Sequence, residues 1–136
     1  MIFSYTKFPL DRPNPLTRER YLCRPVVIID LGHEGHFLQT TALLDTGADW
    51  NFAPLEYASA LDIDVAGCPT VPVGGIGQGT AEAAFAPVRI RIGGKKIDTM
   101  MGFGNFPIIL LGQCGFFDRI KSASFHFPLK FELIFR

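Results

Sequence analysis

The sequence predicts an all-β fold, a barrel or a sandwich, with eight or nine short strands and one or two short helices. Three observations support this prediction. Short runs rich in β-branched and aromatic residues recur along the chain, glycines and prolines separate these runs, and no long stretch has the apolar period of a helix. With 136 residues and 48% hydrophobic side chains, the chain suits one domain that buries a core without disulfides or metals.

The N-terminal region combines one β-rich run with a cluster of prolines. The run "IFSYTKF" (2–8) has the composition of a short strand. Residues 9–25 carry four prolines among charged side chains, which disfavours a helix. We therefore expect residues 1–25 to form an extended arm or strand and residues 26–136 to form the folded domain.

The next segment predicts a hairpin followed by a short helix. The runs "VVIIDL" (26–31) and "HFLQTTALL" (36–44) are strand-like and flank the turn sequence "GHEG". Further along, Pro54 is placed to be the first residue of a helix of about two turns, "PLEYASAL".

The C-terminal half predicts two more hairpins and one interior strand. "VRIRIGGKKIDTM" has Gly93–Gly94 at its turn and places Val88, Ile90 and Ile92 on one face. "FPIILLG" is too short for a buried helix and predicts an interior strand. "QCGFFDRI" predicts one brief helix, and a last hairpin joins "ASFHF" to "KFELIF" at Pro128–Leu129.

The charge balance excludes some partners. Thirteen basic and thirteen acidic residues give a formal net charge of +0, so no field attracts nucleic acid or an anionic membrane. No apolar run approaches the roughly 18 residues of a membrane span, and no signal peptide is visible. Cys23, Cys68 and Cys114 are an odd, widely spaced set, which favours buried free thiols in a reducing compartment. We expect a soluble, cytoplasmic protein with no nucleic-acid or membrane partner.

Two motifs suggest cofactors or metals but lack the required context. The glycine-rich "GGIGQG" (74–79) faintly resembles a dinucleotide loop, yet another strand follows it where a crossover helix is needed. A hairpin tip, or a mobile flap with Ile76 at its apex, fits better. His33 and His36 are three apart in a glycine turn, whereas an HExxH zinc site needs histidines four apart on a helix. We expect neither a metal nor a cofactor.

The segment Asp45-Thr46-Gly47 follows two leucines directly. A carboxylate at the buried end of a strand is costly to ionise unless a partner stabilises the charge. Asp45 is therefore either a turn residue, whose side chain bonds to nearby backbone, or one member of a chemical pair. The Ala48–Asp49 that follows and the later "IILLG" favour the pair.

Together these segments resemble the retropepsins, the retroviral-type aspartic peptidases. The resemblance covers roughly residues 26–120, with the motifs in the order of the family. "LLDTGAD" matches the catalytic loop, "VGGIGQG" the flap, and "PIILLGQCGFF" the apolar strand that ends in glycine and enters a helix. The resemblance implies a closed barrel of the acid protease type with a β-hairpin flap.

The resemblance also implies a mechanism and a partner. An aspartic peptidase needs two carboxylates about 3 Å apart that share one proton, one acting as base toward water and the other as acid. This chain has one such motif, so the expected unit is a homodimer with paired Asp45 side chains that acts on peptide or protein substrates. Thr46 would lock the paired loops and Gly47 would approach the substrate. The expected substrate-binding residues are Ala48, Asp49, Gly75, Ile76 and Gly77.

Two departures from the family leave an alternative open. In retroviral members an arginine follows the glycine of the last apolar strand and pairs with the aspartate that matches Asp49, whereas Gln113 follows Gly112 here. The tail beyond Ile120 is also long, and its hairpin need not reproduce the interleaved terminal strands of the family. The alternative function is a catalytically silent retropepsin-fold module that binds peptide or dimerises.

Overall fold

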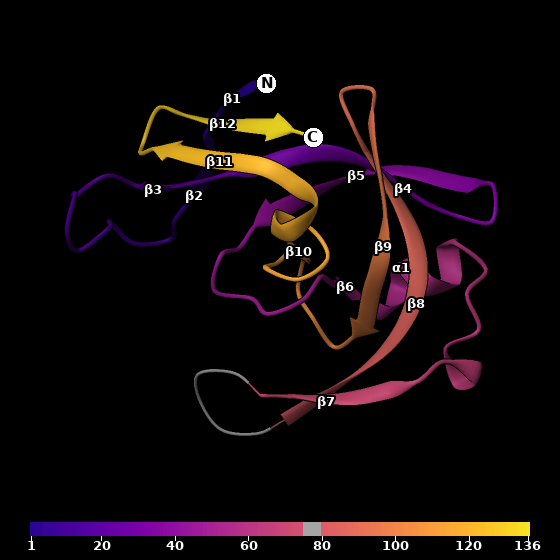
Figure 1. Ribbon diagram of the computed structural model, residues 1–136. Coiled ribbons are helices and arrows are strands. Elements are labelled where there is room, and N and C mark those ends of the chain that lie inside the picture. Colours follow the sequence, from indigo (N-terminus) through magenta and orange to yellow (C-terminus); the bar gives the residue numbers. More distant parts are fainter. Residues whose placement is uncertain (75–79) are drawn as a thin grey trace.

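The computed structural model describes residues 1–74 and 80–136, and strands dominate it (Figure 1). Within these residues there are twelve strands, one α-helix and two 3₁₀ turns. The strands are β1 (Ile2–Ser4), β2 (Thr6–Pro9), β3 (Tyr21–Arg24), β4 (Val26–His33), β5 (His36–Leu44), β6 (Phe52–Pro54), β7 (Thr70–Gly74), β8 (Thr80–Ile92), β9 (Lys95–Gly104), β10 (Ile109–Leu111), β11 (Ile120–His126) and β12 (Lys130–Phe135). The helical segments are α1 (Leu55–Ala60), η1 (Val65–Gly67) and η2 (Phe117–Arg119).

The central sheet closes on itself. Its strand order is β4-β5-β10-β6-β9-β8-β7, and an additional pairing of β4 with β8 joins the ends of a six-stranded barrel. β7 extends beyond the barrel along the first half of β8. The predicted all-β fold with a closed barrel and short helices is therefore confirmed.

The two long hairpins form where glycine turns and alternating apolar residues predict them. In β8, Val88, Ile90 and Ile92 are all buried, as expected for one face of a strand. Gly93 and Gly94 join β8 to β9 with φ angles of 51° and 84°, in the left-handed region that glycine adopts without strain. The barrel interior is therefore built largely from alternate residues of its strands.

Two parallel pairings position the segments that follow their strands. β10 runs parallel to the end of β5, with Leu110 opposite Leu43 and Leu111 opposite Leu44. β6 runs parallel to β9, with Phe52 opposite Gly102. Because parallel strands end at the same edge of a sheet, the segments that leave β5 and β10 emerge side by side.

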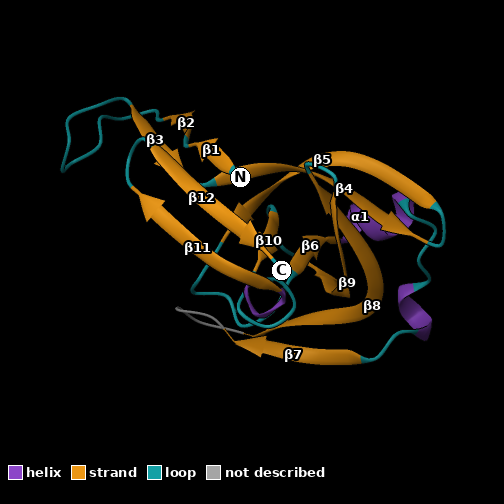
Figure 2. Ribbon diagram, turned by 45° about the horizontal axis from the view of Figure 1, so that its top comes forward, coloured by secondary structure: helices purple, strands orange, loops and turns teal. Residues whose placement is uncertain are grey.

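A separate sheet brings the two ends of the chain together (Figure 2). Its order is β1-β12-β11, with both pairings antiparallel. Phe131 on β12 is completely buried and stacks on Phe3, with ring centroids 5.3 Å apart. Phe131 and Leu133 also belong to the main hydrophobic core, so this sheet is packed on the barrel. β2 and β3 form a two-stranded ribbon of their own.

Several sequence predictions need correction. The helix begins at Leu55, with Pro54 as its cap and as the last residue of β6. The strand count exceeds eight or nine, because β3 and β6 were not expected and "IFSYTKF" divides into β1 and β2. The free thiols are not buried, since Cys114 is exposed and Cys23 and Cys68 are partly exposed.

The predicted flap falls partly outside the described residues. On either side of it, Thr70–Gly74 of β7 pairs antiparallel with the start of β8. Its tip, including Gly75, Ile76 and Gly77, lies outside the described residues. In the described part of the chain, no helix is long and apolar enough to cross a bilayer.

The burial of Phe131 predicts a large loss of stability on truncation. Phe131→Ala should lower the free energy of unfolding by about 3–5 kcal/mol, because it leaves a cavity beneath the terminal sheet. Phe127→Ala is the matched control, since Phe127 is 68% exposed and its removal should cost less than about 1 kcal/mol. Urea denaturation of the two variants measures the difference, and equal losses would contradict the packing described.

Candidate active site

The loop that leaves β5 carries the predicted catalytic residues in a tight turn. The Asp45 N–H donates to the Leu111 carbonyl at 3.0 Å and extends the parallel pairing of β5 with β10. The Ala48 N–H donates to the Asp45 carbonyl at 3.1 Å, and the Gly47 N–H donates to Asp45 Oδ1 at 2.9 Å. The turn therefore fixes both the backbone and the carboxylate of Asp45.

The exposure of these residues divides them into two groups. Asp45 and Ala48 are half-buried, whereas Thr46, Gly47 and Asp49 are exposed. The Asp45 carboxylate thus lies at the edge of the folded chain, with one backbone donor already on it. Asp45 can be both a turn residue and a member of a chemical pair, because the hydrogen bond from the Gly47 N–H that forms the turn also fixes the position of the carboxylate.

A second segment, residues 112–115, clamps this loop from one side. The Gln113 N–H donates to the Ala48 carbonyl at 2.9 Å, and the Cys114 N–H donates to the Asp49 carbonyl at 2.8 Å. The Gln113 side chain adds a third bond, from Nε2 to the Thr46 carbonyl at 2.7 Å. The two segments are therefore held together along their length.

Gly112 is required by this close approach. A Cβ built on Gly112 would overlap the carbonyl oxygen of Trp50 and lie 2.7 Å from that of Ala48. Real Cβ atoms do not approach backbone oxygens so closely, so a larger residue would push the two segments apart.

Asn51 joins the loop, residues 112–115 and the barrel, and sequence reasoning missed it. Its side chain is completely buried. Its Oδ1 accepts from the Gly112 N–H at 3.0 Å, and its Nδ2 donates to the Met100 carbonyl at 3.1 Å and to Thr99 Oγ1 at 3.4 Å. The available signal was a polar residue between the aromatic Trp50 and Phe52. An amide buried in such a stretch needs several hydrogen-bond partners, so it indicates a connection to other segments.

The structure brings part of the predicted site together. Asp45, Thr46, Gly47, Ala48 and Asp49 form one continuous turn at the surface, with Asp45 and Ala48 half-buried. The predicted substrate-binding residues at 75–77 are outside the described residues. Gln113, at the position where the retropepsins carry an arginine, donates from its side chain to the Thr46 carbonyl. Among the described residues, the Asp49 carboxylate makes no ion pair.

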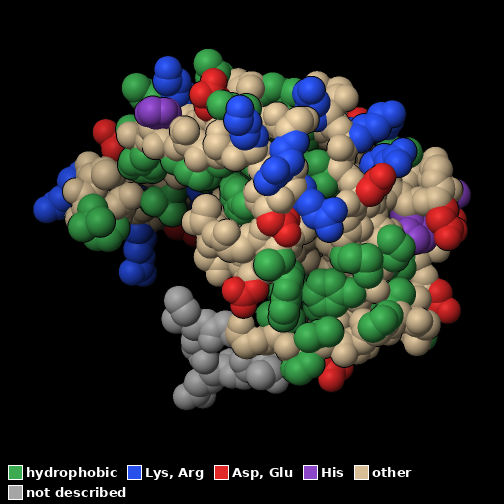
Figure 3. All heavy atoms as spheres, in the orientation of Figure 1, with side chains coloured by type: hydrophobic (Ala, Val, Ile, Leu, Met, Phe, Trp, Pro, Cys, Tyr) green, Lys and Arg blue, Asp and Glu red, His purple; other side chains and the backbone are tan. Residues whose placement is uncertain are grey.

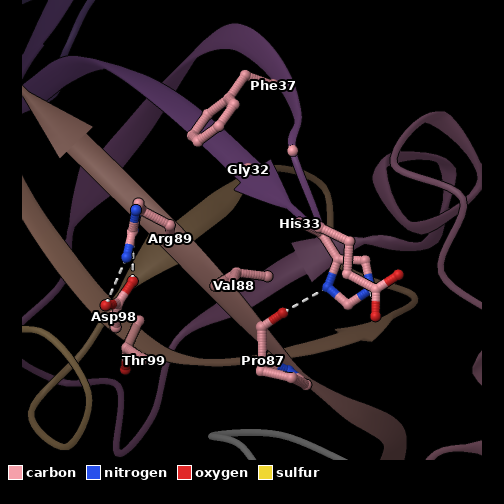
Figure 4. Close-up of a pocket in the computed structure, with 10 residues that line it drawn as sticks. Gly32, His33, Phe37, Pro87, Val88, Arg89, Asp98 and Thr99 are labelled. Atoms are coloured by element: carbon pink, nitrogen blue, oxygen red, sulfur yellow. Dashed lines mark hydrogen bonds and ion pairs between the residues drawn. The ribbon is translucent and has the colours of Figure 1, made fainter.

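A hollow of about 450 Å³ lies near the turn between β4 and β5 (Figure 4). His33 Nδ1 lies 2.7 Å from the Pro87 carbonyl and donates to it. Arg89 donates two hydrogen bonds to Asp98, at 2.6 and 2.9 Å, and these bonds hold the pKa of the Asp98 carboxyl below its ordinary value. The charges of this hollow are therefore already paired. His36 lies near a different carboxylate, so the two histidines do not converge on one ligand position.

Comparison with known proteins adds one structural likeness. No family model matches the chain, and no curated protein matches it. Among solved structures, the chain is similar to EIAV protease complexed with the inhibitor HBY-793. The two are 28% identical, the match covers 65% of this chain and 81% of that chain, and the TM-score is 0.49.

The hydrogen bonds of Asn51 predict that its truncation destabilises the site. Asn51→Ala should lower the free energy of unfolding by about 2–4 kcal/mol, because it leaves the Gly112 N–H and the Met100 carbonyl without their partner. Asn105→Ala, on an exposed asparagine, should change it by less than about 0.5 kcal/mol.

Chemical denaturation measures both variants. Hydrogen exchange adds a local readout, since the Gly112 amide should lose protection in Asn51→Ala before the strands of the barrel do. An unchanged Gly112 amide would show that Asn51 does not connect the two segments.

Proposed function

We propose that this chain is one half of an aspartic endopeptidase, which hydrolyses peptide bonds with a water activated by two Asp45 carboxylates in a homodimer. The observation that carries the proposal is the fixed position of Asp45. Its carboxylate accepts a hydrogen bond from the Gly47 N–H on an exposed turn that residues 112–115 clamp. Such a turn supports catalysis because the reacting group is held before the partner arrives.

The chemistry explains why two copies are needed. Two carboxylates about 3 Å apart cannot both ionise, so they share one proton at the working pH. The ionised carboxylate takes a proton from the water as it attacks the peptide carbonyl, and the protonated carboxyl donates to the carbonyl oxygen. One chain supplies a single Asp45, so the second comes from a symmetry-related copy.

The neighbouring residues take roles that suit their exposure. Thr46 and Gly47 lie at the surface of the turn, where Thr46 contacts the partner loop and Gly47 lets the substrate backbone come close. Ala48 and Asp49 continue the turn and bind substrate. We also assign Gly75, Ile76 and Gly77, which lie outside the described residues, to substrate binding.

The terminal sheet suggests how the copies meet. β12 is paired on both edges within its own chain, by β1 and by β11. Within the described residues, the outer edge of β11 has no strand partner, and an unpaired edge readily accepts another strand. A second copy would therefore add at an outer edge of this sheet instead of interleaving its termini.

Substitution of Asp45 tests the catalytic assignment. Asp45→Asn should reduce cleavage of an unstructured protein such as casein by at least about a hundredfold, because an amide cannot act as base or share the proton. Asp62→Asn, on an exposed carboxylate away from the turn, should cleave at the wild-type rate. Asp45→Asn that cleaves as fast as wild type would overturn the assignment.

The pH dependence of wild-type cleavage tests the shared proton. The rate should follow a bell-shaped curve on the acidic side of neutrality, with two apparent pKa values that belong to the pair of carboxyls. The rate falls at low pH because both carboxyls become protonated, and it falls at higher pH because both lose their protons. A rate that rises steadily into alkaline solution, or one that a chelator abolishes, contradicts this chemistry.

Dilution tests the dimer. Specific activity should fall as the protein is diluted through its dissociation constant, because a monomer holds half of the site. Sedimentation at each concentration, paired with the rate, gives the fraction of dimer. A fully active monomer would overturn the mechanism, and an inactive protein that still binds peptide would support the silent binding module.

A further inference from the structure

A groove of about 670 Å³, here called the β4 groove, lies between the N-terminal strands and the outside of the barrel. Residues of β1 and β2 form one wall, and every residue of the stretch 26–30 in β4 lies on the other, next to Arg91 of β8. Val27 and Ile29 point their side chains into the core, where each is 1% exposed, so they border the groove through their backbone. The volume is typical of a ligand site, and none of the described residues of the candidate active site lines it.

The backbone of β4 has an open edge along the β4 groove. On that side β8 pairs with β4 only at residues 30–32, and no other strand of the described chain pairs with the four residues before them. On the other side, the Leu44 N–H donates to the Pro25 carbonyl at 3.0 Å, at the start of the ladder between β4 and β5. Bonded residues alternate along an antiparallel ladder, so Val26 and Ile28 direct their N–H and carbonyl groups away from β5. These groups are available to the backbone of another extended chain.

Arg91 brings an unused hydrogen-bond donor to the β4 groove. Its guanidinium lies over the Phe37 ring, with Cζ 3.8 Å from the ring centroid, and this contact holds it in place. Its Nη2 lies 3.6 Å from Asp30 Oδ2, which is longer than a hydrogen bond. Its Nε is buried and has no hydrogen-bond partner among the described residues. Because a buried donor without a partner is costly, an acceptor that enters the groove is favoured.

The charges around the β4 groove favour an acidic ligand. The Arg24 guanidinium lies over the ring of Phe8, a residue of the groove wall, at 5.5 Å from its centroid. Within the part of the chain that the structure describes, Arg24 makes no ion pair. Lys96 stands opposite Arg91 across the β8–β9 hairpin, and Figure 3 shows Lys and Arg side chains gathered around this hairpin. Asp30 is the one carboxylate among the described residues that line the groove, so positive charge is in excess there.

We propose that the β4 groove binds an extended acidic segment of a partner protein, which adds as a strand along residues 26–28 and places a carboxylate on Arg91. The open edge favours a peptide, because its N–H and carbonyl groups match those of an added strand. Ile28, 63% exposed beside this edge, offers the same strand an apolar contact. Single-stranded nucleic acid fits less well, since phosphate cannot donate to the free carbonyls and a formal net charge of +0 attracts it weakly.

Binding of a synthetic peptide to the full Asp45→Asn chain, which should not cleave it, tests the proposal. The probe is a blocked, dye-labelled heptapeptide that alternates valine and glutamate. Fluorescence anisotropy at physiological salt should show saturable binding, at least about tenfold tighter than that of a matched peptide of valine and lysine. Equal affinities, or no binding of either peptide, overturn the proposal and leave the proposed function intact. Tighter binding of an oligouridylate of equal length overturns it in favour of nucleic acid.

Three variants separate the groove from a general effect of charge. Arg91→Gln should weaken binding of the glutamate peptide at least about tenfold, because the carboxylate loses its donor and its counter-charge. Arg89→Gln removes the same charge from β8, but Arg89 lies outside the groove and is bound to Asp98, so affinity should stay within about twofold. Asp30→Asn should instead tighten binding, because it removes the carboxylate that competes for Arg91. Unchanged affinity in Arg91→Gln or in Asp30→Asn overturns the proposal, and Asp30→Asn keeps the test valid if Arg91→Gln does not fold.

Amide hydrogen exchange tests the added strand directly. In the free chain the Val26 and Ile28 amides should exchange fast, whereas the Val27 and Ile29 amides, bonded to β5, should exchange slowly. The glutamate peptide should slow the Val26 and Ile28 amides at least about tenfold. Peptide binding without this change would show that no strand is added and would overturn the proposal. If the wild type cleaves no peptide while these amides become protected, the groove stands as a binding site and the peptidase proposal fails.

Discussion

The parallel pairing of β5 with β10 is the constraint on which the candidate site depends. It brings the turn after Leu44 and the segment after Leu111 to the same edge of the barrel, where neither could satisfy its backbone alone. Each segment then supplies the donors or acceptors that the other lacks. The buried Asn51 side chain adds one more bond, because its Oδ1 accepts from the Gly112 N–H. The turn at Asp45 is consequently anchored to the barrel by hydrogen bonds on both sides. These bonds join the same two segments, so the effects on stability of weakening them should not be additive.

The hairpins were the part of the fold that local sequence specified well. The alternating apolar residues of β8 and the turn at Gly93–Gly94 are enough to predict that hairpin. No contact between distant parts of the chain was needed. β6 was missed because three residues carry no periodic signal, and its strand character comes from pairing with β9 and β10. The exposure of Cys114 was missed for a similar reason. Composition favours burial of a thiol, but its position on the clamp decides its exposure.

The candidate site was predicted as a list of residues but not as a structure. Asp45 to Asp49 are consecutive, so one motif identified them all. The contacts that hold them join residues far apart in the chain, with 61 positions between Asn51 and Gly112 and 67 between Thr46 and Gln113. Gln113 illustrates the difference, because the sequence shows a glutamine where the retropepsins carry an arginine, while only the fold shows that its side chain binds the Thr46 carbonyl.

The pairing of β1 with β12 joins the first and the last strands of the chain. During synthesis on the ribosome, β1 leaves the exit tunnel long before its partner exists, while every strand of the barrel is made earlier than β12. The terminal sheet can therefore be completed only after the barrel sequence has emerged. If this sheet supplies the contact between copies, a nascent chain cannot pair through it before β12 has emerged.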